Sequence, residues 1–186
     1  MNDIFTGELV RLSAVPSSEI ARAYAEWNRD SEFKRLLDSD PARLYSARGI
    51  QAWLDKKLDP DNGNFYFFNI CTLKESRLLG DVNLDLVNRY SREAFVGIMI
   101  GDRKDWNKGY GTDAMRVLLG YAFTELNLRR VSLTANGYNP RALRAYEKAG
   151  FKQEGQLREI LLREGKRWDE ITMGVLRDEW MVDRKK

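Results

Sequence analysis

The chain has 186 residues, of which 31 are lysine or arginine and 28 are aspartate or glutamate, so its formal net charge is only +3. This length predicts a single domain over residues 1–186, and charges mixed so evenly argue against a duplex-binding protein, which usually carries a basic stripe. The sequence contains no histidine. This excludes Ser-His-Asp and Cys-His catalysis and every histidine-based metal centre, and we expect no metal site.

The composition also indicates a compartment. No apolar run approaches the ~20 residues that a membrane span needs. The segment MNDIFTGELV has neither the basic start nor the apolar stretch of a signal peptide. The single cysteine, Cys71, allows no internal disulfide, and in the stretch FYFFNICTL we expect it to be a small buried hydrophobe. We therefore expect a cytoplasmic protein with no membrane or nucleic-acid partner.

The first half of the chain predicts one strand, then two helices, then three strands. Ser17 and Ser18 are favoured helix caps, and apolar residues follow them at helical spacing. In residues 78–87 polar and apolar residues alternate, so Asp81 and Asp85 share one side of a strand. In chain order, the expected elements are a strand at 8–12, a helix with Ile20, Tyr24 and Trp27 on one face, a loop at 36–45, a helix near 46–58, and strands at 64–73, 78–87 and 93–101.

The second half predicts helices that alternate with strands, followed by a hairpin. Asn139 is a favoured N-cap, Pro140 suits the first helical position, and Gly150 suits the end of that helix. The other elements expected here are a helix at 109–126, a strand at 129–136, and strands at 151–163 and 167–176 around a turn at 164–166. The order βααβββαβαββ predicts an α/β (α+β) fold: a mixed, mostly antiparallel sheet of six to seven strands with helices on both faces.

One segment indicates phosphate binding. The sequence DWNKGYGTDA, residues 105–114, places Gly109 and Gly111 where a helix is expected to begin. Free N–H groups and the helix dipole favour an anion there, glycine lets the backbone approach it, and Lys108 adds positive charge. A strand-to-helix turn that needs glycine for its dihedral angles explains the same pattern equally well.

The spacing of this loop distinguishes it from two other nucleotide sites. The triphosphate pattern GxxxxGK[ST] is absent. Residues 109–114 match the dinucleotide pattern G-x-G-x-x-A, but that pattern needs a strand directly before it and an acidic residue about 20 positions later. Here DRKDWNK intervenes and Arg129 takes the later position. A nucleotide-dependent oxidoreductase is therefore the alternative interpretation.

Two motifs in order resemble the GNAT acetyltransferase superfamily. VGIMIG followed by WNKGYGTDA looks like its acetyl-CoA-binding motif, and NPRALRAYEKAGF looks like its second motif, N-x-x-A-x-x-x-Y-x-x-x-G-F. The ending GQLREILLREGKRWDEITMGVL is similar to the C-terminal hairpin of the branch with ribosomal-protein N-terminal acetyltransferases and bacterial spermidine acetyltransferases. The resemblance covers roughly residues 8–180 and implies a GNAT-like acyl-CoA N-acyltransferase fold.

The resemblance also implies where acetyl-CoA, as co-substrate, would bind. The pantetheine arm would follow the strand backbone at Ile98, Met99 and Ile100, with Asn139 binding the arm and Tyr146 beside the thioester sulfur. The family pattern has Arg or Gln three residues before the first loop glycine, where this chain has Trp106. The pyrophosphate would lie on the backbone amides of Asn107, Lys108, Gly109, Tyr110, Gly111 and Thr112.

Acetyl transfer to an amine needs a base, an oxyanion donor and, for the departing thiolate, an acid. We expect the amide of Met99 as the oxyanion donor and Tyr146 as the acid. The residues alone favour a core tyrosine on a helical stripe for Tyr146, and only the resemblance favours the acid. Glu93, Asp85 and Asp81 are the candidate bases, although each also fits a solvated polar face, and an ordered water chain can replace a direct base.

The acceptor is expected to be a small-molecule or peptide amine that attacks directly in a ternary complex. Residues considered for its cleft are Trp27, Trp53, Trp168 and Asp169. The resemblance further implies a homodimer or a larger homo-oligomer. Besides the acetyltransferase and the oxidoreductase, a non-catalytic CoA-binding sensor remains a hypothesis.

Overall fold

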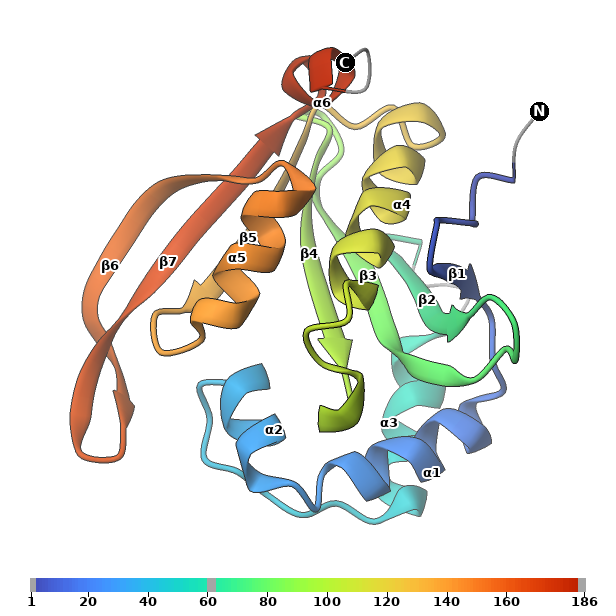
Figure 1. Cartoon of the computed structure of the whole chain (residues 1–186), viewed down its shortest axis with the longest axis vertical. Coiled ribbons are helices and arrows are strands. Elements are labelled where there is room, and N and C mark those ends of the chain that lie inside the picture. Colours follow the sequence, from blue (N-terminus) through green and yellow to red (C-terminus); the bar gives the residue numbers. More distant parts are fainter. Residues whose placement is uncertain (1–2, 60–62, 184–186) are drawn as a thin grey trace.

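The computed structural model describes residues 3–59 and 63–183, and its strands form one seven-stranded sheet in the order β1-β2-β3-β4-β5-β7-β6 (Figure 1). Only β4 and β5 run parallel, and every other neighbouring pair is antiparallel. This confirms the predicted mixed, mostly antiparallel sheet. The strands are β1 (Val10–Ser13), β2 (Phe65–Thr72), β3 (Leu78–Asn88), β4 (Glu93–Ile100), β5 (Arg130–Asn136), β6 (Lys152–Arg163) and β7 (Lys166–Leu176). The helices are α1 (Ser17–Trp27), α2 (Ser31–Leu37), α3 (Ala47–Lys57), α4 (Tyr110–Thr124), α5 (Pro140–Ala149) and α6 (Arg177–Asp183), with a 3-10 turn η1 (Arg103–Asp105).

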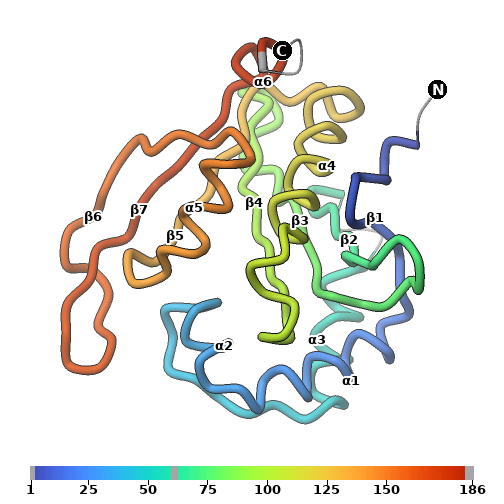
Figure 2. The backbone as a smooth tube through the Cα atoms, viewed as in Figure 1, coloured from blue at the N-terminus to red at the C-terminus, as the bar shows by residue number. Residues whose placement is uncertain are grey.

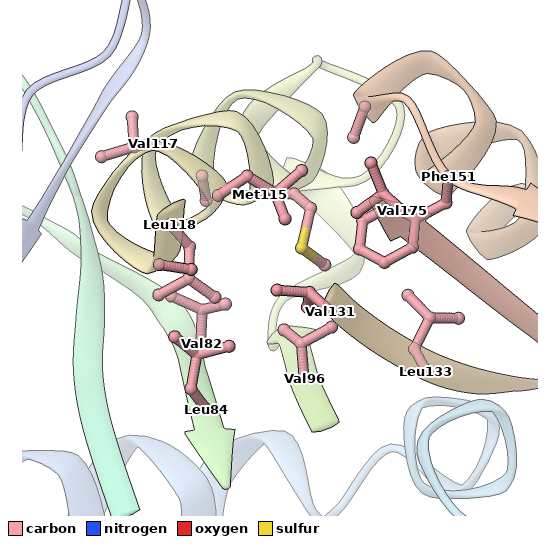
Figure 3. Close-up of a cluster of buried hydrophobic side chains, with 14 of the residues drawn as sticks. Val82, Leu84, Val96, Met115, Val117, Leu118, Val131, Leu133, Phe151 and Val175 are labelled. Carbon is pink, nitrogen blue, oxygen red and sulfur yellow. The ribbon is translucent and has the colours of Figure 1, made fainter. Parts of the chain in front are cut away.

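The main core lies between the sheet and the helix α4. Because side chains alternate along a strand, Val82 and Leu84 of β3 point toward α4 together with Val96 of β4. Figure 3 shows these residues meeting Met115 and Leu118 of α4. The burial of so many branched side chains fixes α4, and therefore its N-terminus, against the end of β4.

A second cluster covers the opposite face of the sheet. Ile20 of α1 and Leu54 of α3 are fully buried there, and Phe67 of β2 packs against them. Helices therefore cover both faces of the sheet, as predicted. Among the described residues, no helix is both long enough and apolar enough to cross a membrane.

The region between α1 and α3 differs from the sequence prediction. Part of the segment expected to be a loop, 36–45, is helical, because α2 ends at Leu37. The side chain of Asp30 caps α2 by accepting hydrogen bonds from the amides of Glu32 (3.0 Å) and Phe33 (3.3 Å), and Phe33 is buried. The tube in Figure 2 shows this helix lying beyond the end of β4 rather than over the sheet.

Two predicted helix caps have different outcomes. Asn139 caps α5 as predicted, accepting a hydrogen bond from the amide of Ala142 (3.2 Å), and Gly150 ends the helix with φ +105°. The serine cap of α1 is wrong, because the helix begins at Ser17 itself and Pro16 takes the cap position with no side-chain hydrogen bond.

The two parallel strands separate, and this opens the sheet. β4 and β5 pair only from Glu93–Arg130 to Phe95–Ser132, although both continue well beyond. The second halves of both strands therefore keep one backbone edge free of strand pairing. The opening lies beside the N-termini of α4 and α5 (Figure 1).

Candidate active site

A single cavity of about 680 Å³ occupies the opening between β4 and β5. It runs from the loop before α4, along α5 as far as Lys148, to the end of α2 and to one residue of β7, Glu170. All the residues predicted to bind the cofactor line this one cavity: Ile98, Met99, Ile100, Asn107, Lys108, Gly109, Tyr110, Gly111, Thr112, Asn139 and Tyr146.

The loop before α4 presents free backbone amides to this cavity. Gly109 adopts φ +86°, a left-handed conformation that glycine accepts readily, and no described side chain caps the helix after it. A Cβ at Gly111 would lie 3.7 Å from Ile100 Cγ1, on the cavity side of the loop. An uncapped N-terminus with close backbone access fits a phosphate or diphosphate group.

Asp113, in the first turn of α4, has a structural role. Its carboxylate accepts hydrogen bonds from three successive amides, those of Glu8 (3.2 Å), Leu9 (2.8 Å) and Val10 (3.0 Å). The negative charge of Asp113, which would repel a phosphate at this helix N-terminus, is therefore bound by the backbone amides that lead into β1. This contact also fixes the loop against the edge of the sheet.

The register of β4 corrects the predicted oxyanion donor. The amide of Gly101 donates to the carbonyl of Leu79 (2.9 Å), and hydrogen-bonded positions alternate along an antiparallel ladder. The amide of Met99 therefore points at β3, opposite Asp81, and cannot face the cavity. The amides of Ile98 and Ile100 point into the opening instead.

Trp106 fixes the end of β4. Its indole Nε1 donates to the carbonyl of Ile100 at 2.8 Å, so the ring is held between the strand and the phosphate loop. The guanidinium of Arg141, from α5, lies over this ring with Cζ 3.5 Å from the centroid. The residue that departs from the family pattern therefore anchors the loop through its side chain.

Tyr146 lies in the wall of the cavity. Its ring packs against Phe151 of the core, with the ring centroids 6.1 Å apart. Burial raises the pKa of Tyr146 to about 12, although the nearby charge of Arg141 opposes this shift. The phenol makes no hydrogen bond to a described residue, so at neutral pH it is a protonated donor available to a ligand.

Asn139 is already bonded at both ends of its amide. Its Oδ1 caps α5 through Ala142, and its Nδ2 donates to the carbonyl of Leu36 (3.3 Å). Asn136 donates to the same carbonyl (3.4 Å). Asn139 therefore joins the last turn of α2 to the cofactor side of the cavity.

Two of the predicted bases lie outside the cavity. Glu93 is at the paired end of β4, where its carboxylate accepts from Arg130 Nε (3.2 Å) and from Ser132 Oγ (3.1 Å). Asp85 is exposed on β3 and lies 3.8 Å from Lys57 Nζ. Neither lines the opening, so both assignments are corrected. Sequence alternation placed Asp85 on one side of its strand together with Asp81, but it could not give the distance of either Asp85 or Glu93 from the loop.

Asp81 is buried under α1, with an exposed fraction of 7%. Burial raises the pKa of Asp81 to about 7, and the hydrogen bond that it accepts from the phenol of Tyr24 acts in the opposite direction. Its carboxylate does not line the cavity. Asp81 therefore has a near-neutral pKa, but its carboxylate lies away from the cavity where an acceptor would bind.

Glu170 is a candidate base that the sequence analysis missed. It lies on β7 opposite Asn136 of β5 and lines the cavity, and its carboxylate makes no hydrogen bond or ion pair with a described residue. The alternation of EITMGV puts Glu170 on the face opposite the core residues Ile171 and Met173. That signal was available, but the pairing of β7 with β5 was needed to bring it to the opening.

The residues considered for the acceptor cleft do not line this cavity. Trp27 packs where a side chain on Gly101 would overlap it, and Trp53 is 54% exposed on α3. Trp168 packs edge-on to Tyr138. Asp169 accepts a hydrogen bond from the amide of Glu159 (2.7 Å) within the hairpin. The part of the cavity beside α2, β5 and β7 is lined instead by Phe33, Leu36, Leu37, Asp38, Thr134 and Glu170.

Comparison with known proteins points to one family. A family model described as an acetyltransferase (GNAT) domain matches residues 10–152. The uncharacterized N-acetyltransferase YnaD of Bacillus subtilis is 34% identical over 160 residues, covering 86% of this chain and 89% of YnaD. The prophage-derived N-acetyltransferase YokL of the same species is 27% identical over 183 residues, 96% of each chain. The structure of spermidine N-acetyltransferase from Vibrio cholerae with CoA and spermine has the same fold, with a TM-score of 0.80 at 24% identity over 92% of this chain and 98% of that one.

Proposed function

The chain belongs to the GNAT acetyltransferase family and is an acetyl-CoA-dependent N-acetyltransferase, and on this premise we propose that it acetylates a primary amine by direct attack within a ternary complex. One observation carries the proposal. The same cavity is lined by the uncapped N-terminus of α4, by the free phenol of Tyr146 and by the free carboxylate of Glu170. A phosphate-bearing donor and an amine therefore have complementary groups in one connected space.

Acetyl-CoA supplies the acetyl group as a reactive thioester. Glu170 accepts a proton from the acceptor ammonium, which otherwise titrates near ~10 and is not nucleophilic. The amine nitrogen then forms its bond to the carbonyl carbon, and the amide of Ile98 or Ile100 donates to the oxyanion. Tyr146 donates its proton to the sulfur as the carbon–sulfur bond breaks, and the nitrogen loses its second proton to solvent as the amide forms. Glu170 then releases its proton to solvent, and solvent reprotonates the phenolate of Tyr146.

The acceptor is proposed to be a primary amine of a small molecule or of a peptide. Asp38 and Glu170 line the acceptor end of the cavity, where they favour a cation before it loses its proton. A screen tests this: the protein and acetyl-CoA are incubated with polyamines, peptides with a free N-terminus, amino sugars and aminoglycosides. Mass spectrometry should show one class gaining a single acetyl group.

Cofactor choice separates this proposal from the oxidoreductase alternative. Acetyl-CoA should raise the melting temperature of the protein, and NAD should leave it unchanged. The reason is that the residues DRKDWNK separate the strand from the first loop glycine, whereas a dinucleotide site needs that glycine directly after the strand. Stabilisation by NAD and not by acetyl-CoA would reverse the assignment.

The proposal also covers the domain organisation, the compartment and the oligomeric state of the protein. We expect residues 1–186 to act as one acetyltransferase domain in the cytoplasm, a reducing compartment compatible with the lone thiol of Cys71. We further expect a homodimer or larger homo-oligomer. A monomer across a wide concentration range in light-scattering chromatography would contradict the oligomer.

A further inference from the structure

The cationic side chains that line the cavity differ in the carboxylates and carbonyl groups that they contact within the protein. Lys108 lies 3.5 Å from the carboxylate of Asp105, and Arg116 donates to the carbonyl of Lys148 at 2.9 Å. Arg141 is half-buried, lines the cavity, and has no carboxylate or hydrogen-bond acceptor among the described residues. The cationic side chains of the lining are Lys108, Arg116, Arg141, Arg144 and Lys148.

Arg141 is held by stacking rather than by an ion pair. Its Cζ lies 3.5 Å from the ring centroid of Trp106, which is itself fixed by its hydrogen bond to Ile100. A guanidinium that stacks through its face keeps its N–H edges free to bind an anion. Glu32 is close enough to favour the charged form of Arg141, but its carboxylate is 2.5 Å from Arg103. Burial acts in the opposite direction and lowers the pKa of Arg141.

The phosphate loop needs such a cation. Lys108 is the only cation of the segment Asn107–Thr112, and it shares the carboxylate of Asp105 with Arg77, whose Nη1 lies 2.7 Å from that carboxylate. Trp106 immediately precedes this segment, so its stacked guanidinium lies beside the start of the loop. From its own segment, a diphosphate on the loop amides would therefore meet one cation, whose charge Asp105 partly offsets.

We propose that Arg141 binds the diphosphate of acetyl-CoA through its free guanidinium edge while its face stays stacked on Trp106. The inference rests on the proposed function and adds a residue from α5 to a site that the sequence attributed to the loop alone. Guanidinium and phosphate oxygens form paired, charge-assisted hydrogen bonds, which are stronger than neutral ones.

Truncated cofactors test the assignment by calorimetry. The ligands are acetyl-CoA, acetyl-dephospho-CoA, which lacks only the 3′-phosphate, and acetyl-pantetheine, which lacks every phosphate. Arg141→Gln should weaken the first two equally, by about 10- to 100-fold in Kd, and leave acetyl-pantetheine unchanged. Arg167→Gln removes an equal charge from an exposed position of β7 outside the cavity lining, and should weaken acetyl-dephospho-CoA by less than about threefold because that charge is screened.

Three results would overturn the assignment: no change with Arg141→Gln, an equal loss with acetyl-pantetheine, or a loss confined to acetyl-CoA, which would place the guanidinium on the 3′-phosphate. If Arg141→Gln does not fold, Arg141→Lys gives the same comparison, because a point charge should lose part of the paired contact but keep binding sensitive to the diphosphate. A wild-type protein that binds none of the three ligands would instead contradict the proposed function.

Discussion

Tyr146 combines a position in the cavity wall with a pKa of about 12, so its proton is available throughout the neutral range. We predict that Tyr146→Phe lowers kcat and kcat/KM together by ~10²–10⁴-fold, with little change in the KM for acetyl-CoA. The variant removes one oxygen and keeps the ring packed on Phe151, so the melting temperature should hardly move. Wild-type turnover in the Phe variant would show that the thiolate departs without this acid.

Glu170 is the second residue whose role can be isolated. Glu170→Gln keeps the size of the side chain but cannot accept a proton, so kcat should fall by ~10²-fold or more. The loss should shrink as pH rises, because more of the amine is then already deprotonated. Glu93→Gln is the matched control on the same sheet, outside the cavity, and should keep wild-type kcat. Equal losses in both variants would refute a specific role for Glu170.

The loop glycines differ in what a side chain would do. Gly109 has a positive φ, so any substitution there strains the backbone as well as filling space. A Cβ at Gly111 would make only ordinary contacts, 3.7 Å from Ile100. We predict that Gly111→Val keeps the fold and abolishes acetyl-CoA binding in calorimetry. A folded Gly111→Val protein with unchanged affinity would remove the phosphate-loop assignment.

The residues best predicted from sequence are those whose role is local. Gly109 and Asn139 were identified because a positive φ and a helix cap depend on neighbours a few positions away. The amide of Met99 was predicted to face the cavity, but which amides of a strand face a neighbouring strand depends on the register with that neighbour, here β3. Glu170 was missed for the same reason, since it reaches the opening only through the pairing of β7 with β5.

Among the elements, the hairpin of β6 and β7 contacts the segment after α2 through hydrogen bonds from Arg163. Nη2 of Arg163 donates to the carbonyl of Asp38 (2.8 Å), lies 3.1 Å from that of Ser39, and contacts the phenol of Tyr138 (3.2 Å). Because Asp38 and Ser39 line the cavity at the end that we propose for the acceptor, this contact positions the wall there.

We predict that Arg163→Met raises the KM of the acceptor severalfold and leaves the KM of acetyl-CoA unchanged, because the phosphate loop lies on another wall. Steady-state kinetics with both substrates varied provides the measurement. Arg35→Gln is the control, since it removes an exposed ion pair, Arg35–Glu164, between α2 itself and the turn of the same hairpin. If Arg163→Met alters both KM values equally, its effect is on the fold as a whole.

The elements that periodicity predicts well are those with a continuous buried stripe, such as α4. The helix α2 was missed because its seven residues bury only Phe33, which is too short a pattern to recognise. Its cap, Asp30 followed by Ser31 and Glu32, was the available signal. The separation of β4 from β5 was not predictable from either strand alone, because neither sequence contains a proline that would mark the end of strand pairing.

At the scale of the whole molecule, the pH dependence of stability should report on Asp81. Its pKa is about 7 in the fold against an ordinary 3.8, so between these values only the folded protein holds the proton. The contribution of Asp81 to stability is therefore fully present below pH 3.8 and is lost as pH rises toward 7, by up to about 1.4 kcal/mol per unit. Asp81→Asn stays neutral, so its free energy of unfolding in urea should exceed that of the wild type more at pH 8 than at pH 5. An equal difference at both pH values would contradict the raised pKa.

Release of free thiol from acetyl-CoA, measured with and without each amine of a panel, decides whether the protein acetylates an amine. We predict thiol release that requires one class of primary amine, with one acetyl group gained by the amine for each thiol released. A protein that binds acetyl-CoA but releases no thiol with any amine would be a sensor rather than an acetyltransferase. Thiol release that proceeds equally without an amine would contradict direct attack in a ternary complex.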